Sequence, residues 1–226
     1  MKRMFEKYKI FLSEEKEEKF EKYYQLLVEY NTKVNLTAII EREEVIVKHF
    51  IDSIIGVDKL VGKKLIDVGS GGGFPAIPIK IIRDDIDITL LEATGKKCEF
   101  LKKVITELEL NNVFVFNKRA EEIAKTVEFR EQFDICTARA VARLNTLCEY
   151  CMPFVKVGGK FVALKGDASE ELKEAERAIK VLGGQVDCVD NFNLEGAKRQ
   201  IVYINKITQT PFGYPRGNGK ERKKPL

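Results

Sequence analysis

Several features are scarce in this sequence, and each scarcity excludes a class of protein or of functional site. No apolar stretch approaches the roughly 18 residues that a membrane-spanning helix requires. The opening residues Met1 to Met4 lead into a charged segment rather than the apolar core of a secretion signal. Internal repeats are lacking, and low complexity is confined to the Gly/Lys/Pro-rich end. We therefore expect a cytoplasmic protein with no membrane partner.

Residues that usually carry nucleophilic or metal chemistry are also few. The five cysteines are an odd number, which without an export signal indicates reduced thiols. Cys148 and Cys151 have redox or zinc spacing, but they fall within a predicted helix and no second Cys or His pair accompanies them. His49, the only histidine, stands beside Phe50 on a predicted helix, which favours a structural role over a catalytic triad. We expect no metal site.

The length and charge of the chain set further bounds. A chain of 226 residues suffices for one full-sized core and a small appendage. The net charge is +4, and residues 207–226 account for all of it with five Lys and Arg residues against one acid, Glu221. We expect this segment to be a flexible basic end. It either meets an anionic partner or serves only as a solvated terminus.

The most informative stretch runs from Leu65 to Pro78. A short apolar run containing Asp67 is followed by four glycines in five residues, which predicts a buried strand turning sharply into a helix. The two prolines of that helix are tolerated only in its first turn. Free amide groups at such a bend suit an anionic part of a ligand, although a tight turn without a ligand has the same pattern. A phosphate-binding P-loop is excluded because no Gly-Lys-Ser or Gly-Lys-Thr follows, and the third glycine of a dinucleotide site would fall at Phe74.

Beyond residue 63, predicted strands and helices alternate, which is typical of a parallel sheet covered on both faces. We expect strands at 65–68, 86–91, 113–116, 133–137 and 160–164, and helices at 96–108, 120–125, 144–151 and 168–182. Strands at 185–190 and 199–206 are joined by a loop too short for a parallel crossover, so they must form an antiparallel hairpin. The predicted organisation is a helical addition at 1–62, with helices near 13–31 and 41–55, an α/β domain at 63–206, and the basic tail.

Ligands of open α/β sheets bind beyond the carboxyl ends of the strands. After the second strand, Glu92 is placed to accept the two hydroxyls of a ribose, unless it is only a solvated strand end. After the third strand, Arg119 to Glu121 either flank an adenine ring or simply begin a helix. Arg139, Arg143 and Lys165 follow the next two strands, where they could meet a carboxylate, a phosphate or a base edge, or form surface ion pairs.

Taken together, several motifs resemble the RsmG (GidB) family, bacterial ribosomal RNA small-subunit methyltransferase G. The motifs are Asn35–Ile39 (NLTAI), His49–Ser53 (HFIDS), Asp67–Pro78 (DVGSGGGFPAIP), Arg119–Glu122 (RAEE), Ala138–Ala140 (ARA) and Tyr214–Arg216 (YPR). The resemblance implies a seven-stranded class I S-adenosylmethionine-dependent methyltransferase fold, Rossmann-like and ending in the antiparallel hairpin. It implies methyl transfer to N7 of a guanosine in 16S ribosomal RNA. The cofactor-binding residues it implies are Gly69, Gly71, Phe74, Glu92, Ala93, Thr94, Ala120, Glu121 and Arg139.

The expected chemistry agrees with the residues that are missing. Guanine N7 has a free lone pair and no proton to remove, so we expect a site that aligns its substrates and has no general base. Arg139, Arg143 and Lys165 are then candidates for placing the RNA, and the basic tail for binding phosphates of 16S rRNA or the small ribosomal subunit. We expect a monomer. A nicotinamide-dependent oxidoreductase with the same bend, or a non-catalytic RNA-binding factor, remains as an alternative.

Overall fold

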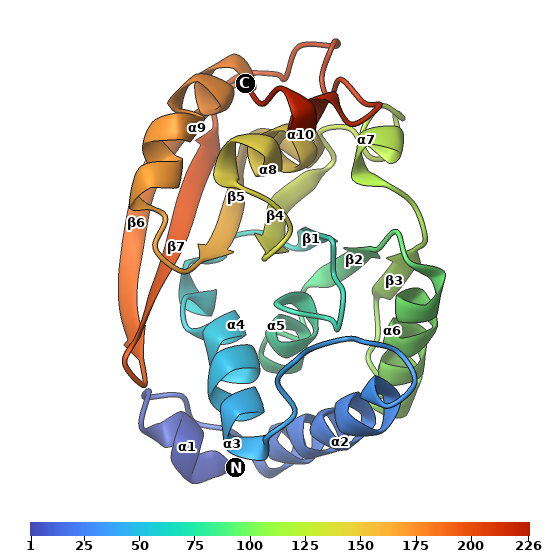
Figure 1. Cartoon of the computed structure of the whole chain (residues 1–226). Coiled ribbons are helices and arrows are strands. Elements are labelled where there is room, and N and C mark those ends of the chain that lie inside the picture. The colour runs from blue at the N-terminus through green and yellow to red at the C-terminus, as the bar shows by residue number, and fades with distance from the viewer.

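A seven-stranded sheet forms the centre of the molecule, and the computed structural model describes it with all of residues 1–226 (Figure 1). The strands are β1 (Lys64–Val68), β2 (Asp87–Leu91), β3 (Val113–Phe116), β4 (Phe133–Arg139), β5 (Val155–Lys165), β6 (Gly184–Leu194) and β7 (Ala197–Lys206). Their order is β3-β2-β1-β4-β5-β7-β6, with β1 to β5 parallel and β7 antiparallel to both β5 and β6. The predicted α/β sheet that ends in an antiparallel hairpin is confirmed.

Two helical layers cover the sheet, and alternate residues of each central strand face one layer or the other. Helices α5 (Ala76–Ile82) and α6 (Gly95–Glu107) pack on the face to which Leu65 contributes. Helices α7 (Ala120–Ile123), α8 (Leu144–Cys151) and α9 (Ser169–Val181) pack on the face to which Ile66 contributes. Strands β1 and β2 are buried on both faces from their second residue on, and three of the five residues in each are apolar. None of the helices combines the length and apolar character needed to cross a membrane.

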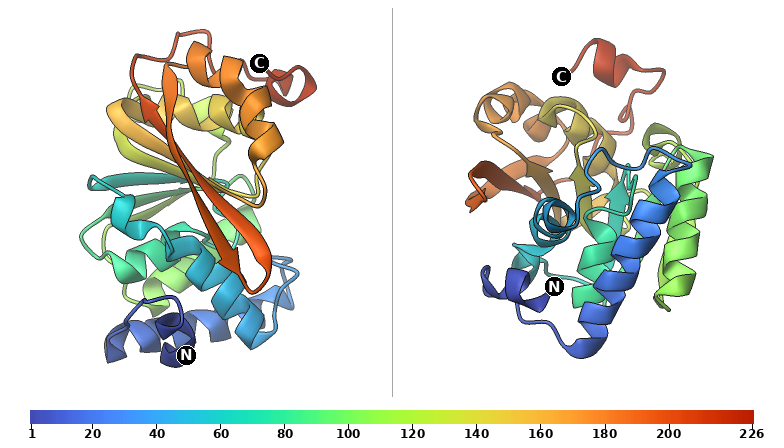
Figure 2. Two further views of the ribbon diagram at one scale, coloured as in Figure 1. Left: turned by 90° about the vertical axis from the view of Figure 1, so that its left-hand side faces the viewer. Right: turned by 60° about the horizontal axis from the view of Figure 1, so that its bottom comes forward.

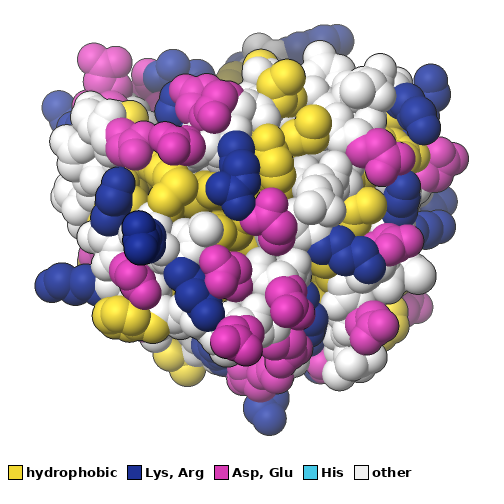
Figure 3. Space-filling view, turned by 90° about the horizontal axis from the view of Figure 1, so that it is seen from below, with side chains coloured by type: hydrophobic (Ala, Val, Ile, Leu, Met, Phe, Trp, Pro, Cys, Tyr) yellow, Lys and Arg dark blue, Asp and Glu magenta, His cyan; other side chains and the backbone are white.

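The N-terminal helices belong to the first of these layers. Helix α2 (Glu14–Asn31) begins where the side chain of Ser13 accepts a hydrogen bond from the Lys16 amide. It lies alongside α5 and α6 (Figure 2). A short helix that the sequence did not indicate, α1 (Lys2–Glu6), precedes it. On the outer side of this layer, Lys and Arg side chains are interspersed with Asp and Glu (Figure 3), and pairs such as Lys22 with Glu107 link α2 to α6.

The predicted helix at 41–55 is interrupted by a π-helical turn. It consists of α3 (Arg42–Val45), the π-helix η1 (Ile46–Ile51) and α4 (Asp52–Ile54), and a 3₁₀ turn, η2 (Val57–Lys59), follows. The wider turn of a π-helix shifts the side chains that follow it around the axis, and such turns often occur at functional sites. Here the π-turn contains His49 and ends immediately before Asp52.

Two predicted loops are instead parts of strands. The predicted turn at 157–159 belongs to β5, which begins at Val155 with an irregular register against β4. The predicted loop at 191–198 is mostly strand, because the β6–β7 pairing continues to Leu194 opposite Ala197. The hairpin closes through Glu195 and Gly196, both with positive φ (50° and 85°), as a two-residue connection of twisted strands requires.

The prediction of a flexible C-terminal end is wrong, because residues 207–226 pack on the second helical layer. The guanidinium of Arg130 donates hydrogen bonds to the carbonyls of Thr210 (2.7 Å) and Tyr214 (2.9 Å). The buried Glu149 accepts hydrogen bonds from the amide (2.8 Å) and the guanidinium (2.7 Å) of Arg216. A short helix, α10 (Lys220–Lys223), ends the segment beside α8. A buried carboxylate such as Glu149 requires a partner, and the tail supplies it.

We predict that the N-terminal helices and the sheet unfold together, because an aromatic cluster joins them. Phe50 is fully buried and lies 5.0 Å from Phe20 and 5.3 Å from Tyr23 between ring centroids. Phe50→Ala should lower the free energy of unfolding by about 3 to 5 kcal/mol. Denaturant unfolding followed by far-UV and near-UV circular dichroism should give one coincident transition. Phe11→Ala is the matched control, since that ring is 78% exposed, and its effect should stay within about 0.5 kcal/mol. Separate transitions for the two probes would contradict a shared core.

Candidate functional site

The carboxyl end of β1 turns into a glycine bend whose backbone only glycine tolerates. Gly69, Gly71 and Gly73 have φ values of 74°, 54° and 95°. A Cβ on Gly69 would lie 2.7 Å from Cγ2 of Val141, and one on Gly73 would lie 2.5 Å from the hydroxyl oxygen of Tyr23. At Gly69 and Gly73 the bend is therefore enclosed by the loop after β4 and by helix α2, with no room for a side chain.

Glu92, at the end of β2, fixes the bend through its carboxylate. Its Oε2 accepts a hydrogen bond from the Gly71 amide (2.9 Å), and its Oε1 accepts one from the Thr94 amide (2.8 Å). The side chain is buried. Each carboxylate oxygen has two lone pairs, so both oxygens can accept one more hydrogen bond.

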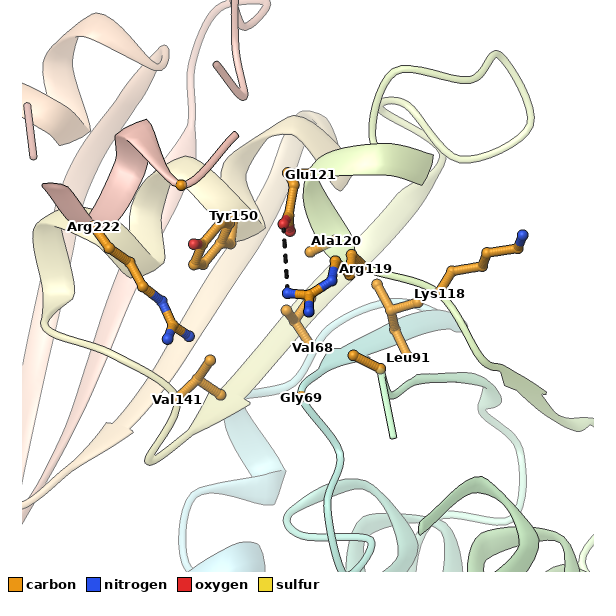
Figure 4. A pocket seen from close by; sticks show the side chains of 12 residues that line it. Val68, Gly69, Leu91, Lys118, Arg119, Ala120, Glu121, Val141, Tyr150 and Arg222 are labelled. Carbon is orange, nitrogen blue, oxygen red and sulfur yellow. Dashed lines mark ion pairs between the residues drawn. The ribbon is translucent and has the colours of Figure 1, made fainter. Parts of the chain in front are cut away.

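A pocket of about 220 Å³ opens beside the bend at the carboxyl ends of the strands (Figure 4). Apolar side chains from the ends of β1 and β2 and from the loop after β4 form part of its wall, namely Val68, Leu91 and Val141. Of the predicted cofactor residues, the pocket is lined by Gly69, Ala93, Ala120 and Glu121. Glu121 pairs with Arg119 at 4.0 Å on one side of the pocket. The remaining predicted residues, Gly71, Phe74, Glu92, Thr94 and Arg139, do not line it and instead support the bend or its neighbours.

Helix α8 and the C-terminal segment complete the pocket, a contact that no sequence pattern predicted. Tyr150 lines it from α8, and Gly219 and Arg222 line it from the tail. In Figure 4 the guanidinium of Arg222 extends toward Val141, on the opposite side from Lys118. A signal that could have suggested the contact was the acidic Glu149 within an otherwise buried helix, because such a charge demands a cation from elsewhere.

A buried cluster of charges lies next to the bend. Asp52 accepts hydrogen bonds from Nε and Nη2 of Arg199 (both 2.6 Å) and from Nη1 of Arg139 (3.0 Å). Arg139 also donates to the carbonyl of Lys48 (3.0 Å), and its guanidinium lies 4.9 Å from the ring centroid of Phe74. Burial lowers the pKa of Arg139 and the Asp52 carboxylate acts against that shift. The π-helix supplies a carbonyl, and the first residue of α4 a carboxylate, to one arginine.

His49 occupies the centre of this cluster and is neutral near pH 7. Its ring stacks on Phe74 at 4.5 Å, and its Nδ1 lies 3.0 Å from Nη2 of Arg139. Burial, followed by the Arg139 charge, lowers the pKa of His49 to about 4. Arg139 can only donate to Nδ1, whereas the Lys48 carbonyl, 3.1 Å from the same nitrogen, can only accept, so these two contacts favour opposite tautomers. Nε2 lies 2.7 Å from the Thr37 hydroxyl oxygen. The two motifs that begin at Asn35 and His49 therefore meet at the bend.

The two other predicted cations are held in ion pairs. Arg143 is exposed and pairs bidentately with Glu174 (2.7 and 3.0 Å). Lys165 donates to the carbonyl of Ala142 (2.8 Å) and pairs with Glu171 (2.7 Å). Their expected role in placing RNA stays a prediction.

The two α8 cysteines lie within the core beneath the pocket. Cys148 and Cys151 are fully buried, and burial raises the pKa of both thiols. Both sulfurs are therefore protonated and shielded from solvent near neutral pH.

The overall fold matches that of solved methyltransferases. The chain superimposes on TYW2 from M. jannaschii in complex with AdoMet (TM-score 0.57, 14% identity, 75% of this chain and 80% of that one). It also superimposes on an SAM-dependent O-methyltransferase from Thermotoga maritima (TM-score 0.54, 14% identity, 82% and 72%). The fold is that of a class I S-adenosylmethionine-dependent methyltransferase.

Sequence comparison narrows this class to one family. The family model described as rRNA small subunit methyltransferase G (GidB) matches residues 16–202. Ribosomal RNA small subunit methyltransferase G of Clostridium beijerinckii is 47% identical over 221 residues, covering 95% of this chain and 92% of that protein. The chain belongs to the rRNA small subunit methyltransferase G family, whose cofactor is S-adenosylmethionine.

The residues around the bend fit this cofactor. Asp67, directly before the bend, accepts a hydrogen bond from the Thr137 hydroxyl (2.8 Å) at Oδ1, whereas its buried Oδ2 has no partner. The free amides predicted for the bend are not found at Gly69 and Gly71, because the first donates to the Leu91 carbonyl (2.8 Å) and the second to Glu92 (2.9 Å). The partnerless carboxylate oxygen of Asp67 suits the ammonium group of an amino acid. The apolar wall formed by Val68, Leu91 and Val141 suits a purine ring.

We predict that Asp67 makes stability depend on pH. Burial raises the pKa of Asp67 from about 3.8 to about 7. Between these values the folded chain binds the proton more tightly than the unfolded chain, so this carboxyl's contribution to stability falls as pH rises. The stability of the wild type relative to Asp67→Asn should therefore drop by roughly 3 kcal/mol from pH 4 to pH 7.

Denaturant unfolding of both proteins at each pH measures this difference. Comparing them at the same pH cancels the opposite contribution of His49, whose lowered pKa adds stability as pH rises through a similar range. Curves that run parallel over the whole range would show that Asp67 does not titrate near 7.

Proposed function

We propose that this chain transfers the methyl group of S-adenosylmethionine to N7 of a guanosine in 16S ribosomal RNA. The observation that carries the proposal is the enclosed glycine bend, fixed by Glu92 and opening onto a partly apolar pocket, in a chain that matches the family over residues 16–202. The name of the C. beijerinckii relative supplies the class of RNA.

The roles of the residues follow from their positions. The glycine bend at Gly69 and Gly71, with Asp67 directly before it, would hold the amino-acid portion of the cofactor. The remaining lone pairs of Glu92 would accept the ribose hydroxyls, with Ala93 and Thr94 beside them.

The purine would lie within the pocket wall, next to Leu91, Ala120 and Glu121. Phe74 and Arg139, which do not line the pocket, would support the bend from its other side. There the Arg139 guanidinium lies over the Phe74 ring.

The reaction mainly requires that the protein align the methyl donor with the guanine. The bound cofactor supplies a methyl group on a positively charged sulfur. Guanine N7 attacks with its own lone pair, so the chain has no proton to remove and must fix the direction of approach. Arg139, held from four sides by Asp52, Lys48, His49 and Phe74, keeps the rim of the site rigid. A rigid rim reduces the entropy that alignment would otherwise cost.

RNA would approach this rim from the side of the strand ends. Arg143 is exposed, and its pair with Glu174 is a surface pair that a phosphate could replace at little cost. Lys220, Lys223 and Lys224 are exposed on the tail. We further propose that Arg139, Arg143 and Lys165 place the RNA, that these lysines bind phosphates, and that the protein acts as a monomer in the cytoplasm on the rRNA or the small subunit.

The proposal predicts methylation of one guanosine at N7. Purified protein, labelled S-adenosylmethionine and small subunits or naked 16S rRNA from cells lacking the gene should yield one labelled site, cleaved by chemistry selective for 7-methylguanosine. Glu92→Gln keeps the shape of the side chain but removes its charge, so cofactor affinity and labelling should both fall about tenfold or more.

Two outcomes would overturn this assignment. Binding of NADH in preference to S-adenosylmethionine would indicate an oxidoreductase. Binding of rRNA with no label transferred to either substrate would indicate a non-catalytic RNA-binding factor.

We also predict that the tail lysines set the salt dependence of RNA binding. Replacing Lys220, Lys223 and Lys224 together by Gln should reduce the slope of log affinity against log salt concentration by about 2, because each phosphate contact to a single strand contributes about 0.7. Filter binding at several salt concentrations measures the slope. The triple variant keeps Arg216 and Glu221, which hold the tail in place. An unchanged slope would exclude these lysines from the RNA interface.

A further inference from the structure

The C-terminal segment contributes to the wall of the cofactor pocket. Gly219 and Arg222 line it from α10 and its preceding turn, together with Tyr150 of α8. The five basic side chains of the tail therefore occupy different surroundings. Arg222 faces the pocket, Arg216 is paired with Glu149, and Lys220, Lys223 and Lys224 do not line the pocket.

The segment is fixed in this position over its whole length. At its start, the Thr210 hydroxyl donates to the Leu182 carbonyl (2.9 Å), and the Thr210 amide donates to Glu131 (2.7 Å). In its middle, Arg130 binds the carbonyls of residues 210, 211 and 214. These contacts tie the segment to the rest of the protein at several points.

The end that carries Arg222 is tied to α8 in particular. Glu149 binds Arg216, and the Thr146 hydroxyl donates to the carbonyl of Glu221 (3.0 Å). The Glu221 carboxylate is buried and accepts a hydrogen bond from the Gly217 amide. Arg222 follows directly, so its starting point is determined by buried contacts even though its guanidinium is exposed.

We propose that α10 completes the adenine end of the S-adenosylmethionine site, with the Arg222 guanidinium covering the purine ring and Tyr150 beside it. This inference rests on the proposed function. The bend and Asp67 suit the amino-acid end of the cofactor and Glu92 the ribose, so the adenine extends to the part of the pocket bounded by Leu91, Ala120 and Val141.

The chemistry of Arg222 matches this place. A guanidinium is planar and delocalised, so it stacks on an aromatic face, which an ammonium group does less well. Figure 4 shows Arg222 reaching toward Val141, on the opposite side of the pocket from Leu91, so an aromatic ring in the pocket would lie between the cation and the apolar side chains of Val68 and Leu91. One basic residue of the tail thereby contacts the cofactor, while the exposed lysines can bind the RNA.

The test measures binding of S-adenosylmethionine and of adenosine by isothermal titration calorimetry. Arg222→Ala should raise both dissociation constants by about the same factor, roughly tenfold, because the lost contact is to the purine. Arg222→Lys should recover only part of the affinity, since it keeps the charge and loses the plane. Lys223→Ala is the matched control, a neighbouring exposed cation outside the pocket, and it should change neither constant by more than about twofold.

The outcomes separate this inference from the proposed function. If wild-type protein does not bind S-adenosylmethionine, the proposed function fails. If wild type binds it and Arg222→Ala binds it equally well, the inference about α10 fails and the enzyme assignment stands. Equal losses in Arg222→Ala and Lys223→Ala would also overturn it, because they would indicate a general effect of charge. The RNA salt slope of Arg222→Ala should match that of wild type, in contrast to the triple lysine variant.

Discussion

The buried carboxylate of Asp52 connects the parts of the chain that the site needs. It receives Arg139 from the end of β4 and Arg199 from β7, and it is itself carried by the helix that follows the π-turn. Breaking a buried pair of this kind by removing one partner typically costs about 3 to 5 kcal/mol, because the remaining charge is stranded. Arg139 then supports Phe74, which begins the step from the glycine bend into α5. This charge cluster therefore links the N-terminal helices, the sheet and the bend.

Much of the architecture could be predicted from the sequence because local patterns specify it. β3 at 113–116 and α8 at 144–151 have the predicted bounds, and β1 differs by one residue. A short apolar run and a helical period are sufficient signals in those places. The hairpin followed from loop length alone, although its strands extend further, because the polar side chains at 191 and 200 bond across the ladder (2.7 Å) and continue the pairing.

The features that could not be predicted are those that join distant segments. Asp52 is 87 residues from Arg139 and 147 from Arg199, so no spacing rule reveals the cluster. The tail was expected to be flexible because its composition is basic and rich in glycine. Hydrogen bonds with Glu149 and Arg130 instead hold it against the folded domain. Within the pocket, Gly69, Ala93, Ala120 and Glu121 lay on predicted strand ends, whereas Tyr150 and Arg222 come from elements whose approach depends on tertiary packing.

The contacts of Glu92 have a consequence for the energetics of the site. A loop rich in glycine loses more conformational entropy on ordering than any other kind of loop. Here the Glu92 carboxylate accepts hydrogen bonds from the amides of Gly71 and Thr94, and these bonds offset the entropy cost when the chain folds. A ligand that docks on a preorganised surface keeps more of its interaction energy as affinity. Glu92 at the end of β2 therefore strengthens ligand binding indirectly, because the backbone of the bend is ordered before the ligand binds.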